Sequence, residues 1–381
     1  MYISRVQLTN WRNFRNADAR LKPRAYLVGP NASGKSNFLD VFRFIRDIVK
    51  DGGGLQYAIA SRGKLSKIRC LAARSNPIVT ICVELSPFSD EGNTWTYSIA
   101  IRQESRGYRR TVLAHEKVWK NEKLILDRPT KEDKRDKELL TETDLENVKS
   151  NSAFREVADF FKAISYMHLI PQLLRYPDNF PIAERGEDFF GRSFLERVAQ
   201  TPEKQRKSRL KFIEQALRTA VPQLQSLKKV TDDMGHPHLE VVYEHWRSQG
   251  AKQREDQFSD GTLRLIALMW SLLDGDSLLL LEEPELSLNA AIVRQLSPLI
   301  YKAQKRKKRR QVIISTHDYN LLSDPGIGAE EVLILQPEHE GTSIQSAFDN
   351  TLFRSLMENG LSAADAGVSE TNLPGKLSGV L

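Results

Sequence analysis

Hydrophobic and polar residues alternate along residues 78–85, 94–102 and 110–119. An alternation with a period of two turns one face of a strand toward a core and the other toward solvent. The connections between the three segments have the length of hairpin turns. The pattern therefore predicts an antiparallel β-meander in the first part of the chain.

Three further segments, residues 25–28, 277–281 and 311–316, are apolar without alternation. Continuous apolar runs bounded by turn signals are typical of buried parallel strands. Apolar residues recur at helical spacing after the first of these runs, over 37–49, and again over 263–273. Strands of this kind alternating with helices predict an α/β fold with a mixed sheet.

The middle of the chain has a different pattern. Residues 120–151 are densely charged and lose periodicity, which predicts a solvated linker. Helices are predicted over 154–164, 188–200 and 202–220, and a strand over 239–246. No heptad repeat extends far enough for a long coiled coil. We expect a compact helical insertion and three parts: residues 1–119, 120–238 and 239–381.

The first apolar run leads into a glycine-rich loop that has the full pattern of a phosphate-binding loop. Two glycines allow the backbone N–H groups to curl around phosphate oxygens, and the following helix adds its positive end. Lys35 would reach the β- and γ-phosphates, and Ser36 would offer a hydroxyl to Mg²⁺. The loop predicts that the chain binds a nucleoside triphosphate with Mg²⁺; its residues are Gly29, Pro30, Asn31, Ala32, Ser33, Gly34, Lys35 and Ser36.

Three other segments carry candidate chemistry. The second apolar run ends in Glu282 and Glu283, which suit a Mg²⁺ shell and the activation of water, although acids can also simply flank a core strand. Ser259 and Gly261 open the helix at 263–273, as an anion-binding helix start or as an ordinary cap. His317 ends the third run, which we expect to neighbour the Glu282 strand. Two roles are open for His317: contact with a γ-phosphate, or a purely structural role at the end of its strand.

The order of these motifs resembles the ABC-type ATPases, and residues 3–15 and 282–288 are similar to the soluble RecF/SMC/OLD group. The resemblance covers roughly residues 1–115 and 240–340. It implies a P-loop NTPase fold of ABC type, with an antiparallel β-subdomain and an inserted, mainly helical subdomain.

The resemblance also implies roles for individual residues. Glu283 would be the catalytic base, with His317 as the switch histidine and Lys35 at the phosphates, while Glu282 would hold Mg²⁺ through water. Residues 287–289 occupy the D-loop position. Arg12, Asn13 and Asn37 would contact the nucleotide beside the loop. The position of the ABC signature is occupied by Ser259, Asp260, Gly261 and Thr262. The signature of one copy would complete the nucleotide site of a second copy, which implies a head-to-tail dimer around two ATP molecules. Gln56, Arg62 and Gln172 are alternatives for the Q-loop.

Composition adds three points. The only cysteines are Cys70 and Cys82, too few for a disulfide framework, and no apolar run is long enough to span a membrane, so we expect a cytoplasmic protein. The net charge is +7, and basic residues gather at 302–310 and, more weakly, at 204–211. These runs suit either sequence-independent contact with nucleic acid or an ordinary solvated helix end.

The 64 residues that follow His317 are too few for the Toprim nuclease domain of OLD-type relatives. They predict a strand at 331–335, a hairpin near Gly341 and a helix at 352–358. Stand-alone ATPases of this form resemble those of bacterial anti-phage systems such as PARIS or Septu, which implies control of a separately encoded effector. A RecF-like DNA-repair ATPase and a nucleotide-bound scaffold with negligible turnover remain alternatives.

Overall fold

The structure is a computed structural model, and it describes residues 1–73, 76–89, 92–104, 109–176, 191–244, 251–307 and 310–366. The chain forms two compact units. Unit 1 comprises Met1–Ser165, Asp276–Leu280 and Arg309–Leu381, and unit 2 comprises Tyr166–Gly275 and Leu281–Lys308. The first division therefore falls at Ser165, whereas charge density in the sequence suggested a boundary after residue 119.

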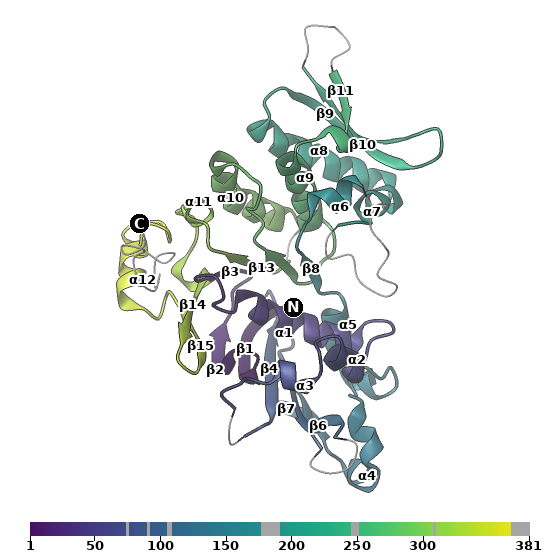
Figure 1. The fold of residues 1–381 in the computed structure, drawn as a ribbon, viewed down its shortest axis with the longest axis vertical. Helices are drawn as coiled ribbons and strands as arrows, with labels where there is room; N and C mark the ends of the chain where they lie inside the picture. The colour runs from purple at the N-terminus through teal and green to yellow at the C-terminus, as the bar shows by residue number, and fades with distance from the viewer. Residues whose placement is uncertain are drawn as a thin grey trace, which may run out of the picture. The chain divides into compact units, whose positions relative to one another are not determined.

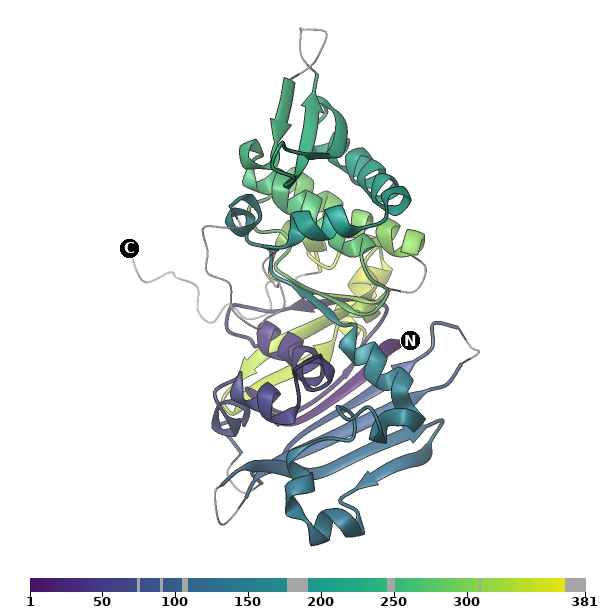
Figure 2. The same ribbon diagram turned by 90° about the vertical axis from the view of Figure 1, so that its right-hand side faces the viewer.

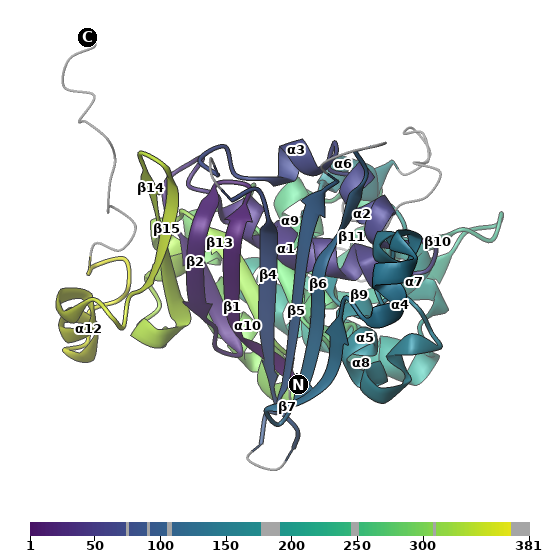
Figure 3. The same ribbon diagram turned by 90° about the horizontal axis from the view of Figure 1, so that it is seen from below.

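Unit 1 contains the predicted meander. β4, β5 and β6 pair in antiparallel order and extend into a six-stranded sheet of order β2-β1-β4-β5-β6-β7 (Figure 3). The turn between the first two strands holds Arg12 at a φ of 50°. The bounds are β1 Tyr2–Trp11, β2 Phe14–Arg20, β4 Val79–Ser86, β5 Trp95–Gln103, β6 Thr111–Lys120 and β7 Lys123–Arg128.

A second six-stranded sheet has the order β15-β14-β3-β13-β12-β8 (Figure 1). β3 lies between β14 and β13 and runs parallel to both. The apolar runs predicted the parallel strands β3 and β13, whereas no orientation was predicted for β14. β12 and β8 begin in unit 1 and carry the chain into unit 2. The bounds are β3 Arg24–Val28, β8 Ser165–Met167, β12 Leu279–Glu282, β13 Val312–Thr316, β14 Val332–Glu338 and β15 Gly341–Ser346.

Helix α1 (Lys35–Val49) follows β3 and packs its aromatic residues against the first sheet. The rings of Phe38 and Phe14 are 6.1 Å apart, and those of Phe44 and Trp11 are 5.2 Å apart. Burial of four aromatic rings makes this contact a large part of the apolar core. The other α-helices of unit 1 are α2 Leu55–Ala60, α3 Leu65–Ile68, α4 Lys131–Arg135, α5 Arg155–Lys162, α11 Tyr319–Leu322 and α12 Thr351–Glu358.

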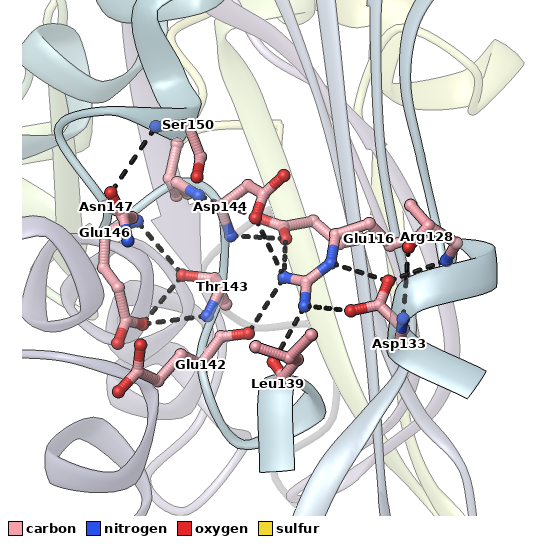
Figure 4. Close-up of polar contacts among 12 residues, drawn as sticks. Glu116, Arg128, Asp133, Leu139, Glu142, Thr143, Asp144, Glu146, Asn147 and Ser150 are labelled. Carbon is pink, nitrogen blue, oxygen red and sulfur yellow. Dashed lines mark hydrogen bonds and ion pairs between the residues drawn. The ribbon is translucent and has the colours of Figure 1, made fainter. Parts of the chain in front are cut away.

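The segment expected to be a solvated linker is ordered instead. β7 pairs with β6, and Arg128 at its end is buried at the centre of a polar network (Figure 4). Its guanidinium donates to the carboxylates of Asp133 and Glu116. Glu116 also accepts hydrogen bonds from the backbone N–H groups of Asp144 and Leu145. Charge density misled the prediction because a few of these charges, those of Arg128, Asp133 and Asp144, pair with one another inside the protein.

Unit 2 is mainly helical, as expected, with one small sheet of order β11-β10-β9 (Figure 2). Its helix α8 matches the predicted helix closely, whereas β9 was not predicted, because its alternation is short and rich in lysine. The bounds are α6 Pro171–Arg175, α7 Phe194–Gln200, α8 Glu203–Ala220, β9 Leu224–Thr231, β10 Pro237–Tyr243, β11 Ala251–Arg254, α9 Asp260–Leu273 and α10 Ala290–Lys307.

Parts of several predictions, within 188–190, 245–246, 308–309 and 367–381, lie outside the described residues. Among the helices that are described, none is long and apolar enough to cross a membrane. Cys70 and Cys82 are both free thiols.

Candidate functional site

The two glycines of the predicted phosphate loop lie where a side chain could not. A Cβ on Gly29 would come within 2.4 Å of the carbonyl oxygen of Leu335 in β14. Gly34 has a φ of +98°, and a Cβ there would lie 2.1 Å from the side-chain nitrogen of Asn13. Both positions therefore require glycine, for close packing at Gly29 and for a left-handed backbone at Gly34.

Lys35 is held inside the loop. Its Nζ donates to the carbonyl oxygens of Gly29 and Pro30 at 2.7 and 3.0 Å, and its side chain is buried. Helix α1 begins at this residue, with no side-chain cap and no acid in its first turn. Its first backbone N–H groups and its positive end are therefore suited to an anion. Ser36, the next residue, is exposed.

Asn13 braces the loop from outside. Its Nδ2 donates to Thr342 Oγ1 at 2.6 Å and to the Ser33 carbonyl oxygen at 3.3 Å, and its Oδ1 accepts from Asn37 at 2.7 Å. The predicted residues Asn13 and Asn37 thus meet beside the loop. Thr342 lies at the start of β15 and was missed, because nothing in the sequence links positions 329 residues apart.

Arg12 lies on the same side but is engaged in an ion pair. Its guanidinium donates to Asp40 of α1 at 2.6 Å, and Arg62 donates to the same carboxylate at 2.9 Å. Burial alone would raise the pKa of Asp40, but the charges of Arg62 and Arg12 outweigh burial and hold this pKa below its usual value. Arg12 and Asn13 also line a cavity of about 620 Å³ that extends to Lys67 and His339.

His317 lies beside the phosphate loop, as predicted. Thr316 pairs with Val28 in the parallel ladder of β13 and β3, so His317 is level with Gly29 at the carboxyl ends of the two strands. The side chain of His317 is exposed. β13 also neighbours β12, the strand that ends in Glu282, which confirms the predicted strand order. Ligands of open α/β sheets bind at this edge.

The acid pair belongs to unit 2. Glu282 accepts a hydrogen bond from the hydroxyl group of Tyr166 in the neighbouring strand β8. Glu283 has a φ of 43°, a left-handed backbone conformation that costs a non-glycine residue about 1 kcal/mol or more. Strain of this kind is concentrated at active sites, where it fixes a side chain in one direction. Tyr166 was missed because a tyrosine in a three-residue strand carries no sequence signal.

The signature segment and the D-loop position pack together in unit 2. Ser259 caps α9, its Oγ accepting from the backbone N–H of Thr262 at 3.2 Å. A Cβ on Gly261 would lie 2.9 Å from the carbonyl oxygen of Ser287. Ser287 itself has a φ of 65°. Gly261 therefore allows a close backbone approach between the two motifs.

The three candidates for the Q-loop have other contacts. Gln56 donates to the carbonyl oxygens of Thr111 and Thr141. It thus joins α2 to the start of β6 and to the segment that follows α4. Arg62 pairs with Asp40. Gln172 lies in unit 2 and donates to Asp260 of the signature segment at 3.1 Å, beside an ion pair of 2.6 Å between Arg175 and the same carboxylate.

The residues of the loop fit a triphosphate. The fit rests on two glycines that permit the tight course of the loop, one buried lysine and the uncapped start of a fifteen-residue helix. Mg²⁺ in such sites is held by phosphate oxygens and water with few protein ligands, and Ser36 offers a hydroxyl group.

Comparison with known proteins agrees with this geometry. The sequence pattern of a family described as "AAA domain, putative AbiEii toxin, Type IV TA system" matches residues 25–323, most of the chain. No curated protein matches the sequence.

The fold is that of ABC- and SMC-type P-loop ATPases. An SMC head bound to the C-terminal winged-helix domain of ScpA has a TM-score of 0.54 at 14% identity, over 91% of this chain and 98% of that one. The SMC head of Thermotoga maritima has a TM-score of 0.50 at 13% identity, over 91% and 99%. An SMC head from Pyrococcus furiosus, bound to the C-terminal domain of ScpA, has a TM-score of 0.50 at 14% identity, over 94% and 99%.

Proposed function

Because the chain belongs to the AAA-domain family described as putative AbiEii toxin of a type IV toxin–antitoxin system, we propose that it binds ATP with Mg²⁺ and hydrolyses it. The observation that carries this proposal is the geometry of the loop 29–36, in which Lys35 is fixed by two loop carbonyls at the start of α1. Lys35 would neutralise phosphate charge, and His317 would lie beside the same edge.

We propose Glu283 as the general base that takes a proton from the attacking water. Its strained backbone conformation supports this role, because the strain persists only where the surroundings enforce it. Chain connectivity supports it too, since β12 leaves the sheet beside β13 and Glu283 follows its last residue directly. Glu282, oriented by Tyr166, would hold the water shell of Mg²⁺.

Steady-state phosphate release from the purified protein tests this proposal. Glu283→Gln should lower kcat by about 100-fold or more and retain ATP affinity, because the amide keeps the shape but cannot accept the proton. Lys35→Ala should weaken ATP binding by about tenfold or more. Glu338→Gln and Lys22→Ala, at exposed positions of unit 1, are the matched controls. Wild-type turnover in Glu283→Gln would refute the assignment, and negligible turnover of the unaltered protein would favour a scaffold.

We further propose that ATP joins two copies head to tail, with the signature residues 259–262 of one copy facing the phosphates of the other. The close contact of Gly261 with Ser287 supports this, because it presents the start of α9 and the D-loop position as one surface. Light scattering of Glu283→Gln with and without ATP tests it. A nucleotide-dependent dimer is the expected result, and a monomer at saturating ATP would exclude it.

The biological role that we propose is control of a separately encoded effector in bacterial anti-phage defence. The family description, which names a toxin–antitoxin system, supports a two-protein arrangement. Native mass spectrometry of Glu283→Gln, purified with its neighbouring genes expressed, should show a stoichiometric second protein. A homodimer that carries nucleic acid instead would favour a RecF-like DNA-repair ATPase.

A further inference from the structure

The two basic runs of the sequence come together on one face of unit 2. Arg306, near the end of α10, donates to Ser208 Oγ of α8 at 2.6 Å. Its guanidinium also lies 5.1 Å from the ring centre of Phe212 on the same helix. The end of α10 is therefore fixed against α8, although Ser208 and Arg306 are 98 residues apart in sequence. We call this surface the α8–α10 face; its exposed cations are Lys204, Lys207, Lys211, Lys302, Lys305 and Arg306.

The positive charge of the chain is concentrated in these helices. α8 contains six Lys and Arg against two Glu, a net charge of +4, and α10 contains five Lys and Arg and no acid, a net charge of +5. The whole chain has a net charge of only +7, so the remaining residues together carry −2. The basic character is therefore local, and local charge of one sign attracts a polyanion.

Several of these cations lack a protein counter-ion. No ion pair joins Lys204, Lys211 or Lys302 to any residue that the structure describes, whereas Lys207 pairs with Glu203 at 2.6 Å. Arg209 differs, because it pairs with Asp274 and lies over the ring of Trp270. Arg310 is buried and donates to the Ser277 carbonyl oxygen in unit 1, so it does not belong to the face. Like charges held together in this way repel one another until a polyanion neutralises them.

The aromatic rings near the face indicate which polyanion fits. The ring of Phe212 is covered by Arg306, and that of Tyr301 is covered by Lys305 at 4.6 Å. A cation therefore lies over each ring where an unpaired base would stack, although Tyr301 remains 47% exposed. A duplex suits such a face, because it presents phosphates and keeps the faces of its bases stacked inside. Tyr301 is the only exposed large apolar residue of the two helices among those described, so the face offers little to insert into a membrane.

We propose that the α8–α10 face binds the phosphate backbone of double-stranded nucleic acid without reading its sequence. The contacts are made by lysine and arginine to phosphate oxygens. Binding releases counter-ions from the nucleic acid and therefore weakens steeply as the salt concentration rises. This binding does not depend on ATP hydrolysis. It gives the proposed ATPase a second ligand, bound by residues of unit 2, whereas the phosphate loop belongs to unit 1.

Fluorescence anisotropy with a labelled duplex of about 30 base pairs, without nucleotide and over about 50 to 200 mM salt, tests the proposal. The triple variant Lys204→Gln, Lys211→Gln, Lys302→Gln should lose affinity by about tenfold or more, and its slope of log affinity against log salt should fall by about 3. The control Lys123→Gln, Lys131→Gln, Lys134→Gln removes the same charge from exposed positions of unit 1 and should bind like the unaltered protein.

Each other outcome overturns the proposal. These outcomes are an absence of duplex binding, equal losses in the two triple variants, tighter binding of a single strand of the same length, and binding of phosphatidylserine vesicles in place of the duplex. Thermal melts of both triple variants exclude misfolding as the cause of a loss. Because the binding assay contains no ATP, its failure leaves the proposed ATPase activity untouched, and the converse also holds.

Discussion

The hydroxyl group of Tyr166 donates a hydrogen bond to the carboxylate of Glu282, and thus joins the side chains of two neighbouring strands, β8 and β12. The carboxylate that we propose for the Mg²⁺ shell is therefore held by a residue outside the known motifs. Tyr166 is a positioning residue, because it acts through Glu282.

Tyr166→Phe should raise the Mg²⁺ concentration needed for half-maximal hydrolysis by about fivefold, the effect of losing one hydrogen bond worth about 1 kcal/mol. ATP affinity measured without Mg²⁺ should be unchanged. Phosphate release over a Mg²⁺ titration measures the effect. Tyr57→Phe, which removes one hydrogen-bond partner of Lys50 in unit 1, is the control. Identical Mg²⁺ curves for Tyr166→Phe and the unaltered protein would contradict the positioning role.

Asp40→Asn should destabilise the protein by about 3 kcal/mol, because it leaves the partly buried charges of Arg12 and Arg62 without their shared carboxylate. Asp18→Asn removes a similar ion pair, with Arg5, at a half-exposed position and should cost less than about 1 kcal/mol. Urea unfolding of both variants gives the comparison. Equal losses would mean that the Asp40 pairs are no stronger than surface pairs.

Gly261→Ala should prevent the ATP-dependent dimer that we propose while leaving ATP binding intact. The added methyl carbon would lie 2.9 Å from the Ser287 carbonyl oxygen and would push the signature segment away from the D-loop position. Light scattering in the Glu283→Gln background measures dimer formation. Gly235→Ala is the control, because its φ of +89° strains the backbone of its loop while nothing lies near the added methyl group, and it should still form the dimer. A dimer of normal affinity in Gly261→Ala would show that this contact is not needed.

The stability of the protein should fall as the pH rises from about 5 to 8. Burial raises the pKa of Glu116 to about 7, from the 4.5 expected in the unfolded chain. Between these two values the unfolded chain releases a proton that the folded protein keeps. The contribution of Glu116 is therefore complete below pH 4.5 and is lost as the pH rises through 7. Burial also raises the pKa of Asp144 and Glu146, with the same sign.

Urea unfolding at pH 5 and pH 8 should show a loss of up to about 3 kcal/mol from Glu116. Glu116→Gln removes this titration, so the variant should show a smaller difference between the two pH values. Glu122→Gln, on an exposed turn, should keep the full difference. A pH dependence that is unchanged in Glu116→Gln would mean that other groups cause it.

Local patterns were enough to predict the elements that form the site. The strand before Gly29, the helix after Gly34 and the strand before His317 were all predicted, because each has its periodicity and its end signals within a few residues. The sequence also predicted that the His317 strand neighbours the Glu282 strand, which the order β13-β12 confirms. The pairing of β13 with β3, which brings His317 level with Gly29, was not predicted.

Long-range pairing could not be predicted in the same way. Tyr166 meets Glu282, and Asn13 meets Thr342, across more than a hundred residues in each case. The charged segment after β6 was misinterpreted for a related reason. Arg128 gains its hydrogen bonds and ion pairs only after β7, α4 and residues 139–144 have folded around it.

The place of β3 between β13 and β14 has a consequence for the order in which the site is completed. The family pattern ends at residue 323, before β14 begins, yet Gly29 abuts Leu335 and Asn13 is held by Thr342. A chain that stopped at residue 323 would leave β3 as an exposed edge strand. During synthesis, the nucleotide loop is therefore fully supported only after β14 and β15 have emerged.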